Sequence, residues 1–422
     1  MARTKAPLVA VLGVTALVLS ACGGGTGSGA AAGGSGDAAK KVTSIKLVAA
    51  EYSKDHTAKF WKQFAEKYKA KTGITLEVQV VDWDSIDQQS STMIQNNNAP
   101  DVLNLNAYAS YAKDKLLYSA DEVLSPAVKS DVLDAFVKSG TYQDKMYGMP
   151  DLSSARALFY NKDLFDKAGI KAPPKTWADF ETAAAKVQAL GDGNIGYAMP
   201  LGPEESQGEF SIWAFNNGGD WKADGKWTIN SAKNIETLSF LKKLSVENKV
   251  TQNNPGKTNR AQAFSLFTSG KAGMVVGFSP LAATLDAKKV NYGVAPMPTK
   301  ESGGTPQTFG VTDYLMSFKK AGNQDAIKAF YDLYYQKDQV NEFIKAEGFL
   351  PVTKSGVEAF ASDPKLKVYL NTLPNIHLTP TDDPTWDKVK LAVQQNLGIA
   401  VGPNGDPKSV LDDLQKAAEN GS

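Results

Sequence analysis

Cysteine and histidine are scarce in this chain of 422 residues, which contains only Cys22, His56 and His377 of these two types. A single cysteine excludes an internal disulfide and a thiolate metal site. Two histidines argue against a histidine-dependent catalytic mechanism and against a zinc site. The sequence therefore predicts a protein without a metal ion or another cofactor.

Long apolar runs are also scarce. The N-terminal run from Leu8 to Leu19 has 12 residues, against the roughly 20 that a helix needs to cross a bilayer. Arg3 and Lys5 precede the run and small residues follow it, which is the layout of a secretory signal. We therefore expect residues 1–21 to be a signal peptide.

A cysteine stands directly after this segment, in the sequence Leu19-Ser20-Ala21-Cys22-Gly23. The motif resembles the lipobox of bacterial lipoproteins, in which the cysteine sulfur receives a diacylglyceryl group. The alternative is an ordinary signal peptide that has a cysteine near its end by chance. Two acyl chains anchor a protein stably, so the lipobox implies attachment to the cell membrane at its extracytoplasmic face. Residues 22–40 are mostly Gly, Ala, Ser and Thr and are expected to form a flexible tether.

The charges are balanced. Without Arg3 and Lys5, 44 basic side chains face 45 acidic ones, so the sequence suggests no nucleic-acid partner. The 401 residues that follow the expected signal peptide exceed the usual size of a single hydrophobic core. Two domains, or two interleaved lobes, are therefore expected.

Strand and helix patterns alternate at the start of the folded region. Residues 44–52 and 74–80 have strand patterns, and so does the short segment 101–106. Aromatic residues recur at helical spacing between Phe60 and Tyr68, and a second helix is expected over 85–97. The resulting β-α-β-α-β order predicts a mainly parallel sheet covered by helices.

Later segments continue this α/β pattern. Thr176 is expected to cap a helix together with Asp179, three residues on. Asp224 and Gly225 predict the turn of a hairpin. The region from Gln324 onward is expected to be mostly helical, and further strands are expected over 157–161, 274–278, 292–295 and 311–318.

Several short segments, taken in order, resemble a known family. They are 98–102 (NAPDV), 146–150 (MYGMP), 157–165 (ALFYNKDLF), 217–219 (NGG), 292–298 (YGVAPMP) and 348–352 (GFLPV). Together they identify the chain as similar to the extracellular solute-binding proteins of ABC importers, in the branch that includes the maltose-binding proteins.

The resemblance implies a type II periplasmic-binding-protein fold, in which a cleft between two α/β lobes holds the ligand. Residues 41–153 plus 312–342 would form lobe 1, and residues 154–311 plus 343–422 would form lobe 2. It further implies a monomer that closes on a sugar and is read by the transmembrane subunits of an ABC permease.

A sugar needs amides and carboxylates for its hydroxyls and aromatic faces for its C–H surfaces. Polar and aromatic side chains stand near the C-terminal ends of the first three predicted strands, where open α/β sheets bind ligands. The amides could also satisfy local backbone groups. Asp84 would more simply cap the following helix. The candidates in this region are Tyr52, Trp83, Asn104, Asn106 and Tyr108.

The expected crossings between the lobes add Asp151, Ser154, Arg156 and Asp313. Maltose binders have a glutamate where Ser154 aligns, which argues against maltose itself. Arg156 could bond ligand oxygens or pair with a carboxylate. Asp313 could accept from the ligand or bond groups within the hinge.

The resemblance also assigns candidates to the second lobe. Glu205 and Gln207 align with sugar-contacting residues of the family, and Trp213 is a weaker candidate because its helical spacing also fits a core residue. Phe278 replaces a stacking tryptophan of relatives. Trp386 matches another stacking position.

Two other functional classes fit the sequence less well. An exported carbohydrate hydrolase would use two carboxylates, but the chain has no nucleophile elbow, phosphate loop or H-E-x-x-H motif. A structural or adhesive surface lipoprotein would have repeats or long low-complexity stalks, and only the short tether has such a composition. Binding without catalysis is therefore the favoured interpretation.

Overall fold

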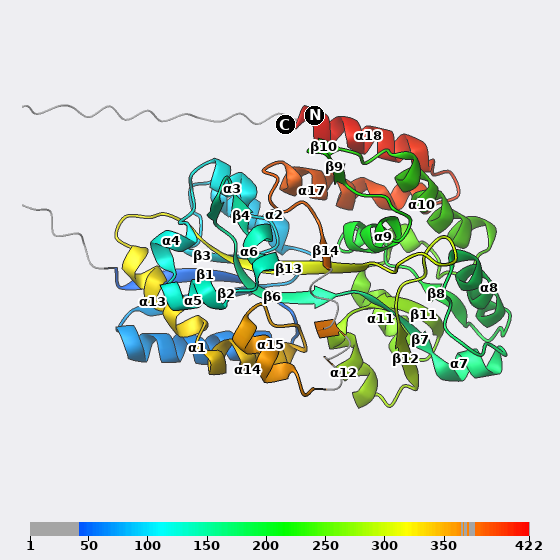
Figure 1. Ribbon diagram of the computed structural model, residues 1–422, viewed down its shortest axis with the longest axis horizontal. Helices are drawn as coiled ribbons and strands as arrows, with labels where there is room; N and C mark the ends of the chain where they lie inside the picture. The colour runs from blue at the N-terminus through cyan, green and yellow to red at the C-terminus, as the bar shows by residue number, and fades with distance from the viewer. Residues whose placement is uncertain (1–41, 364–365, 367–368, 371–375, 422) are drawn as a thin grey trace, which may run out of the picture. The chain divides into compact units, whose positions relative to one another are not determined.

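The computed structural model describes residues 42–363, 366, 369, 370 and 376–421. The expected signal peptide, Cys22 and the tether lie outside the described residues. No described helix combines the length and apolar character needed to cross a membrane. Two main sheets, each flanked by helices, and two short hairpins make up the described fold (Figure 1).

The first sheet has six strands in the order β14-β13-β3-β1-β2, with β6 beside β13. β1 is parallel to β2 and β3, as the β-α-β-α-β pattern predicts. β13 is antiparallel to β3 and β6 and parallel to β14. The bounds are β1 (Ser44–Ala50), β2 (Thr75–Val81), β3 (Val102–Leu105), β6 (Met149–Ala155), β13 (Thr308–Ser317) and β14 (Ile376–Leu378).

The second sheet has four strands in the order β12-β7-β11-β8. β11 is parallel to β8, whereas β7 is antiparallel to both of its neighbours. The bounds are β7 (Ala157–Asn161), β8 (Ile195–Ala198), β11 (Ala272–Gly277) and β12 (Tyr292–Ala295).

The α/β fold class is confirmed. The first sheet has three parallel and two antiparallel pairings. The second has one parallel and two antiparallel pairings, so the prediction of a mainly parallel sheet is wrong for the second sheet only. The strands that connect the two sheets account for the antiparallel pairings. β6 ends at Ala155 and β7 starts at Ala157, so only Arg156 separates the two sheets along the chain. β13 follows the last strand of the second sheet and runs antiparallel beside β6 (Figure 1). β14 also interrupts the region that was expected to be mostly helical.

Helices around the first sheet enclose an aromatic core. Buried Phe60, Trp61 and Phe64 form one stripe of α1, and the Trp61 ring stacks on Tyr334 of α13 at 5.6 Å between centroids. The bounds are α1 (Thr57–Thr72), α2 (Ile86–Gln95), α3 (Ala109–Lys113), α4 (Ala120–Val123), α5 (Pro126–Asp131), α6 (Asp134–Ser139), α13 (Gln324–Tyr334), α14 (Lys337–Glu347) and α15 (Lys354–Phe360), with the hairpin β4 (Thr141–Tyr142) and β5 (Lys145–Met146).

Helices around the second sheet enclose a second core, in which Trp213 contacts Phe180 at 4.9 Å and Tyr197 at 5.9 Å between ring centroids. The bounds are α7 (Lys162–Lys167), α8 (Trp177–Gln188), α9 (Ser206–Phe215), α10 (Ala232–Lys242), α11 (Arg260–Thr268), α12 (Ser279–Ala287), α17 (Trp386–Asn396) and α18 (Pro407–Asn420), with the π-helix η1 (Lys243–Glu247), the 3₁₀ helices η2 (Pro255–Lys257) and η4 (Leu397–Val401), and the hairpin β9 (Lys222–Ala223) and β10 (Lys226–Trp227).

Two local predictions are confirmed. Thr176 caps α8 by accepting from the backbone N–H of Asp179, and the Asp179 carboxylate accepts from the backbone N–H of Thr176 in return. Asp224 and Gly225 both have positive φ and join β9 to β10. A tight two-residue hairpin turn requires such backbone angles, which explains the Asp-Gly pair.

The expected lobe boundary between residues 342 and 343 falls inside α14. This helix packs on α1 and α13. Ser355 of α15 donates to Asp131 of α5 at 2.5 Å. Residues 343–360 therefore accompany the helices of the first sheet, whereas α17 and α18 pack with α9 and α10 around the second.

Candidate functional site

The two crossing strands, β6 and β13, present several of the predicted residues together. Ser154 lies opposite Val311 in their pairing, and the backbone N–H of Arg156 donates to the carbonyl of Phe309 at 2.9 Å. Directly opposed residues, and alternate residues along a strand, share one face of a sheet. Ser154, Arg156 and Asp313 therefore lie on the same face, which we call the crossing face.

Arg156 is held in a buried ion network. Its Nη2 lies 2.6 Å from Oε1 of Glu205. Arg260 lies 3.1 Å from the other oxygen of Glu205 and 2.7 Å from Glu204. Both guanidinium groups also approach the ring of Phe278, at 4.3 and 5.3 Å from its centroid. Phe278 thus supports two cations.

Only one carboxylate oxygen of Asp313 has a hydrogen-bond partner among the described residues. The Tyr52 hydroxyl lies 2.9 Å from its Oδ2 and 3.1 Å from Oδ1 of Asn104. The single hydrogen of the Tyr52 hydroxyl can bond only one of these two acceptors. When Asp313 is ionised, the other acceptor therefore receives no hydrogen bond from Tyr52. Burial raises the pKa of Asp313 to about 6. Trp83 packs edge-on against Tyr52 at 5.7 Å, so the ends of β1, β2 and β3 meet here.

Two buried polar atoms here, Nε of Arg156 and Oδ1 of Asp313, have no hydrogen-bond partner among the described residues. Oε1 of Gln207, in the first turn of α9, is also buried and unpaired. The next residue, Gly208, adjoins Glu205: a Cβ there would lie 2.9 Å from Oε1 of Glu205. Buried polar groups are normally paired, so the unpaired atoms of Arg156 and Asp313 mark a site suited to a polar ligand.

Asp151 lies in β6 where its pairing with β13 shifts register, between the partners of Asp313 and Tyr314. Its carboxyl accepts from Nδ2 of Asn104 at 2.9 Å and from the Tyr334 hydroxyl. Burial raises the pKa of Asp151 to about 8. Asn104 therefore joins Asp151 to the Tyr52 and Asp313 pair as a supporting residue.

Polar contacts link the ends of the first-sheet strands to elements of the second sheet. Nζ of Lys390, on α17, lies 3.0 Å from Oδ1 of Asn106 and 2.8 Å from Asp87. Asp84 accepts from Nδ2 of Asn259 at 2.8 Å. The expectation that Asp84 caps α2 is wrong, because that cap position is taken by the following residue.

Three predicted residues lie in the cores instead. The Tyr108 hydroxyl donates to the carbonyl of Ser139, and Nε1 of Trp213 donates to Glu209. Trp386 is 1% exposed and packs against two other tryptophans, Trp221 and Trp227. These environments fit core residues better than ligand contacts.

Three charged residues of this region, Arg260, Glu204 and Lys390, were not predicted from the sequence. Arg260 is the first residue of α11, where the helix dipole disfavours a cation. A basic residue at a helix start could therefore have served as a signal for carboxylate partners. Lys390 lies within a helix and carries no comparable signal.

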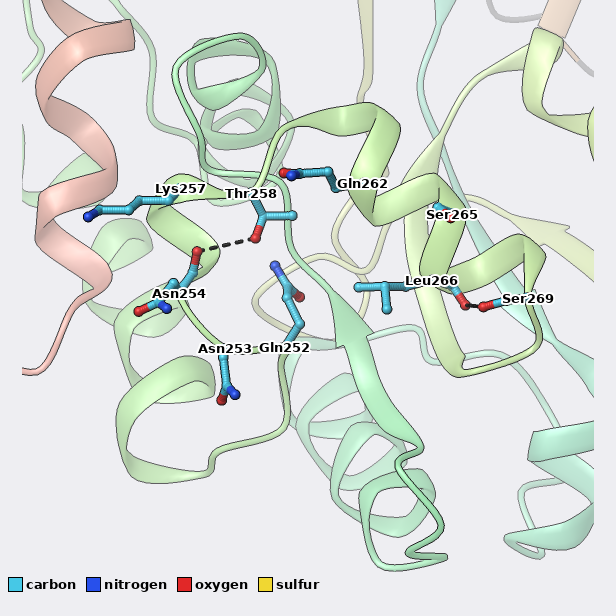
Figure 2. A pocket seen from close by; sticks show the side chains of 9 residues that line it. All are labelled: Gln252, Asn253, Asn254, Lys257, Thr258, Gln262, Ser265, Leu266 and Ser269. Atoms are coloured by element: carbon cyan, nitrogen blue, oxygen red, sulfur yellow. Dashed lines mark hydrogen bonds between the residues drawn. The ribbon is translucent and has the colours of Figure 1, made fainter.

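A separate hollow of about 460 Å³ lies near α11 and is shown in Figure 2. Its dashed lines show Thr258 donating to the carbonyl of Asn254 and Ser269 donating to that of Leu266. The hollow shares no residue with the crossing face. Among the described residues, no cluster of His, Cys, Asp and Glu could hold a metal ion.

Comparisons with known proteins identify the family of the chain. The family model described as bacterial extracellular solute-binding protein matches residues 53–341. A binding protein of Brucella abortus (strain 2308) is 28% identical over 386 residues, which cover 89% of this chain and 92% of the relative. The sn-glycerol-3-phosphate-binding periplasmic protein UgpB of Escherichia coli is 28% identical over 236 residues, covering 52% of this chain and 53% of UgpB.

Solved structures show the same fold at low sequence identity. Maltose-bound MalE3 of T. maritima superposes with a TM-score of 0.77 at 20% identity and covers 89% of this chain and 99% of its own. A Thermotoga lettingae solute-binding protein with bound α-D-tagatose gives 0.76 at 20% identity, covering 90% and 99%. The Listeria monocytogenes protein Lmo0181, in complex with cycloalternan, gives 0.75 at 20% identity with the same coverages.

Proposed function

Since the chain belongs to the bacterial extracellular solute-binding protein family, we propose that it captures a sugar and delivers it to an ABC importer. Solute-binding proteins bind without catalysis, so the ligand is released unchanged. The proposed site is the crossing face with the residues around it: Tyr52, Trp83, Asn104, Ser154, Arg156, Glu205, Gln207 and Asp313.

One observation carries this proposal. Arg156, Asp313 and Gln207 each keep a buried polar atom that has no partner among the described residues. A sugar hydroxyl both donates and accepts, so a ring of hydroxyls can satisfy a donor and two acceptors at once. The aromatic Tyr52 and Trp83 beside Asp313 could cover the apolar edge of a sugar ring.

The ligands bound in similar structures support a sugar. They are maltose, α-D-tagatose and cycloalternan. Closure around such a ligand would bring the two sheets together and so distinguish the loaded state, which the permease subunits would recognise.

The lipobox around Cys22 supports a location at the membrane. Lipidation there and the Gly-rich tether would keep the folded part near its permease. Labelling of the full chain with a radioactive fatty acid tests this part. A Cys22→Ala variant should lose both the label and the association with membranes.

Thermal melting of the full chain with maltose, tagatose, other sugars, polyols and amino acids tests the ligand class. A ligand at 100 times its Kd should add about 2.7 kcal/mol of stability. One sugar that raises the melting midpoint and is recovered unchanged supports the proposal. Stabilisation by an amino acid alone, or consumption of the sugar, contradicts it.

A further inference from the structure

The cations in and next to the proposed site are already paired. Arg156 contacts Glu205, while Arg260 contacts both Glu204 and Glu205. The third cation, Lys390, lies 2.8 Å from Asp87. Each positive charge thus has a carboxylate within 3.1 Å.

Burial and packing make this pairing hard to rearrange. The side chains of Arg156 and Glu205 are 4% and 6% exposed. Phe278 lies beneath both guanidinium groups. A phosphate that took over either guanidinium would leave a buried carboxylate without its partner, which is strongly unfavourable.

The polar atoms that remain unpaired favour a ligand that can donate hydrogen bonds. Oδ1 of Asp313 and Oε1 of Gln207 can only accept, unless Asp313 is protonated, whereas Nε of Arg156 can only donate. A phosphate dianion offers no hydrogen to Asp313 and would repel its carboxylate. A hydroxyl satisfies either kind of atom.

We infer that this site selects uncharged polyhydroxylated ligands and rejects their phosphate esters, with Glu204 and Glu205 as the residues that determine this specificity. The inference rests on the proposed function and narrows its ligand class. It separates this chain from its UgpB relatives, which are sn-glycerol-3-phosphate-binding proteins.

The test uses the full chain and its variant Glu204→Gln/Glu205→Gln, which frees both guanidinium groups while keeping side-chain size. Binding of sn-glycerol 3-phosphate, glucose 6-phosphate and inorganic phosphate is measured by calorimetry beside glycerol and glucose. The unaltered chain should bind none of the three anions. The variant should bind at least one anion, about tenfold or more tighter than the weakest affinity that the calorimetry can detect, because a charge-assisted bond becomes available.

A matched control is Glu181→Gln/Glu236→Gln, which removes the same charge from carboxylates paired with Lys243 and Lys300. It should gain no anion binding. If the double variant at the site does not fold, Glu204→Gln alone frees one contact of the less buried Arg260.

Binding of a phosphate ester by the unaltered chain would overturn the inference, and so would a folded site variant that gains no anion binding. Failure of the proposed function looks different. In that case no sugar binds the unaltered chain, while the anion measurements on chain and variant still decide whether the paired carboxylates exclude phosphate.

Discussion

Two buried carboxyl groups, Glu209 in the second core and Asp313 on the crossing face, share a low exposure of 1% and 4%. Glu209 accepts from the Tyr197 hydroxyl and from Nε1 of Trp213. Asp313 has the Tyr52 hydroxyl on one oxygen and no described partner on the other. Burial is therefore common to both carboxyls, and the difference between them is the buried, unpaired Oδ1 of Asp313.

The aromatic residues show the same contrast. Trp213 and Trp386 lie among other rings within the second core. Tyr52 is only partly buried and reaches from the end of β1 toward Asp313. Substitutions in the second core should therefore reduce stability, whereas substitutions on the crossing face should reduce affinity.

Trp386→Ala should have the largest effect on stability, about 3–5 kcal/mol, because a buried indole leaves a cavity between two tryptophans. Urea unfolding monitored by circular dichroism measures it. Val294→Ala, at a position 37% exposed, is the control and should have little effect. If Trp386→Ala left stability unchanged and abolished sugar binding, Trp386 would be a ligand contact rather than a core residue.

Glu205→Ala should destabilise by about 3 kcal/mol, since it leaves the buried Arg156 without its carboxylate. Sugar affinity should fall as well, because the guanidinium loses its fixed position. Unfolding and calorimetry on the same preparations separate the two losses. Full stability together with weak binding would show that Glu205 acts only as a ligand contact.

Asp313→Asn should lower sugar affinity by roughly 10- to 100-fold, the usual cost of one charged hydrogen bond. Stability should change little, because the amide keeps the size of the side chain and can still bond Tyr52. Calorimetry with the best sugar of the melting panel gives the affinity. The same change at Asp338, a residue in the first turn of α14, is a control that should leave binding unchanged.

The pH dependence of stability should separate supporting carboxyls from the site. Burial raises the pKa of both Asp151 and Glu209 to about 8, far above the model-peptide value near 4. The folded state therefore keeps protons that the unfolded chain releases, and stability falls as pH rises from about 4 to about 8, by at most about 1.4 kcal/mol per pH unit and group.

Asp151→Asn should reduce this slope between pH 6.5 and 8, where Asp313 has already titrated, without abolishing it, because Glu209 remains. Unfolding at a series of pH values gives the slope. An identical slope in the variant would show that Asp151 is ionised in the folded protein.

The sequence predicted the α/β architecture better than the site. Alternating patterns located β1, β2, β3 and their connecting helices because that order of elements is local. Mixed sheets were missed, since the direction of β13 depends on a return from a distant part of the chain. Tyr52, Asn104 and Asp313 were predicted separately, but no local pattern shows that their side chains meet.

The predicted tryptophans show a second limit of prediction from the sequence. Trp386 was predicted to stack on the ligand, yet Trp221 and Trp227 cover its ring from a region more than a hundred residues earlier. Arg260 was overlooked because its carboxylate partners precede it by more than fifty residues. Partner assignments of this kind depend on tertiary contacts alone.

Asp84→Ala should have the smallest effect, because its exposed carboxylate makes one bond, to Asn259. Burial and the nearby charge of Glu204 raise the pKa of Asp84, so its removal also relieves repulsion. The two effects should nearly cancel, leaving sugar affinity within about threefold, as for other exposed contacts. Calorimetry at low and high salt measures this, with Ser110→Ala, which removes the 2.8 Å bond to the partly buried Asp387, as a second contact between elements of the two sheets. A tenfold loss in either variant would mean that such contacts control binding, and that unpaired buried atoms alone do not define the site.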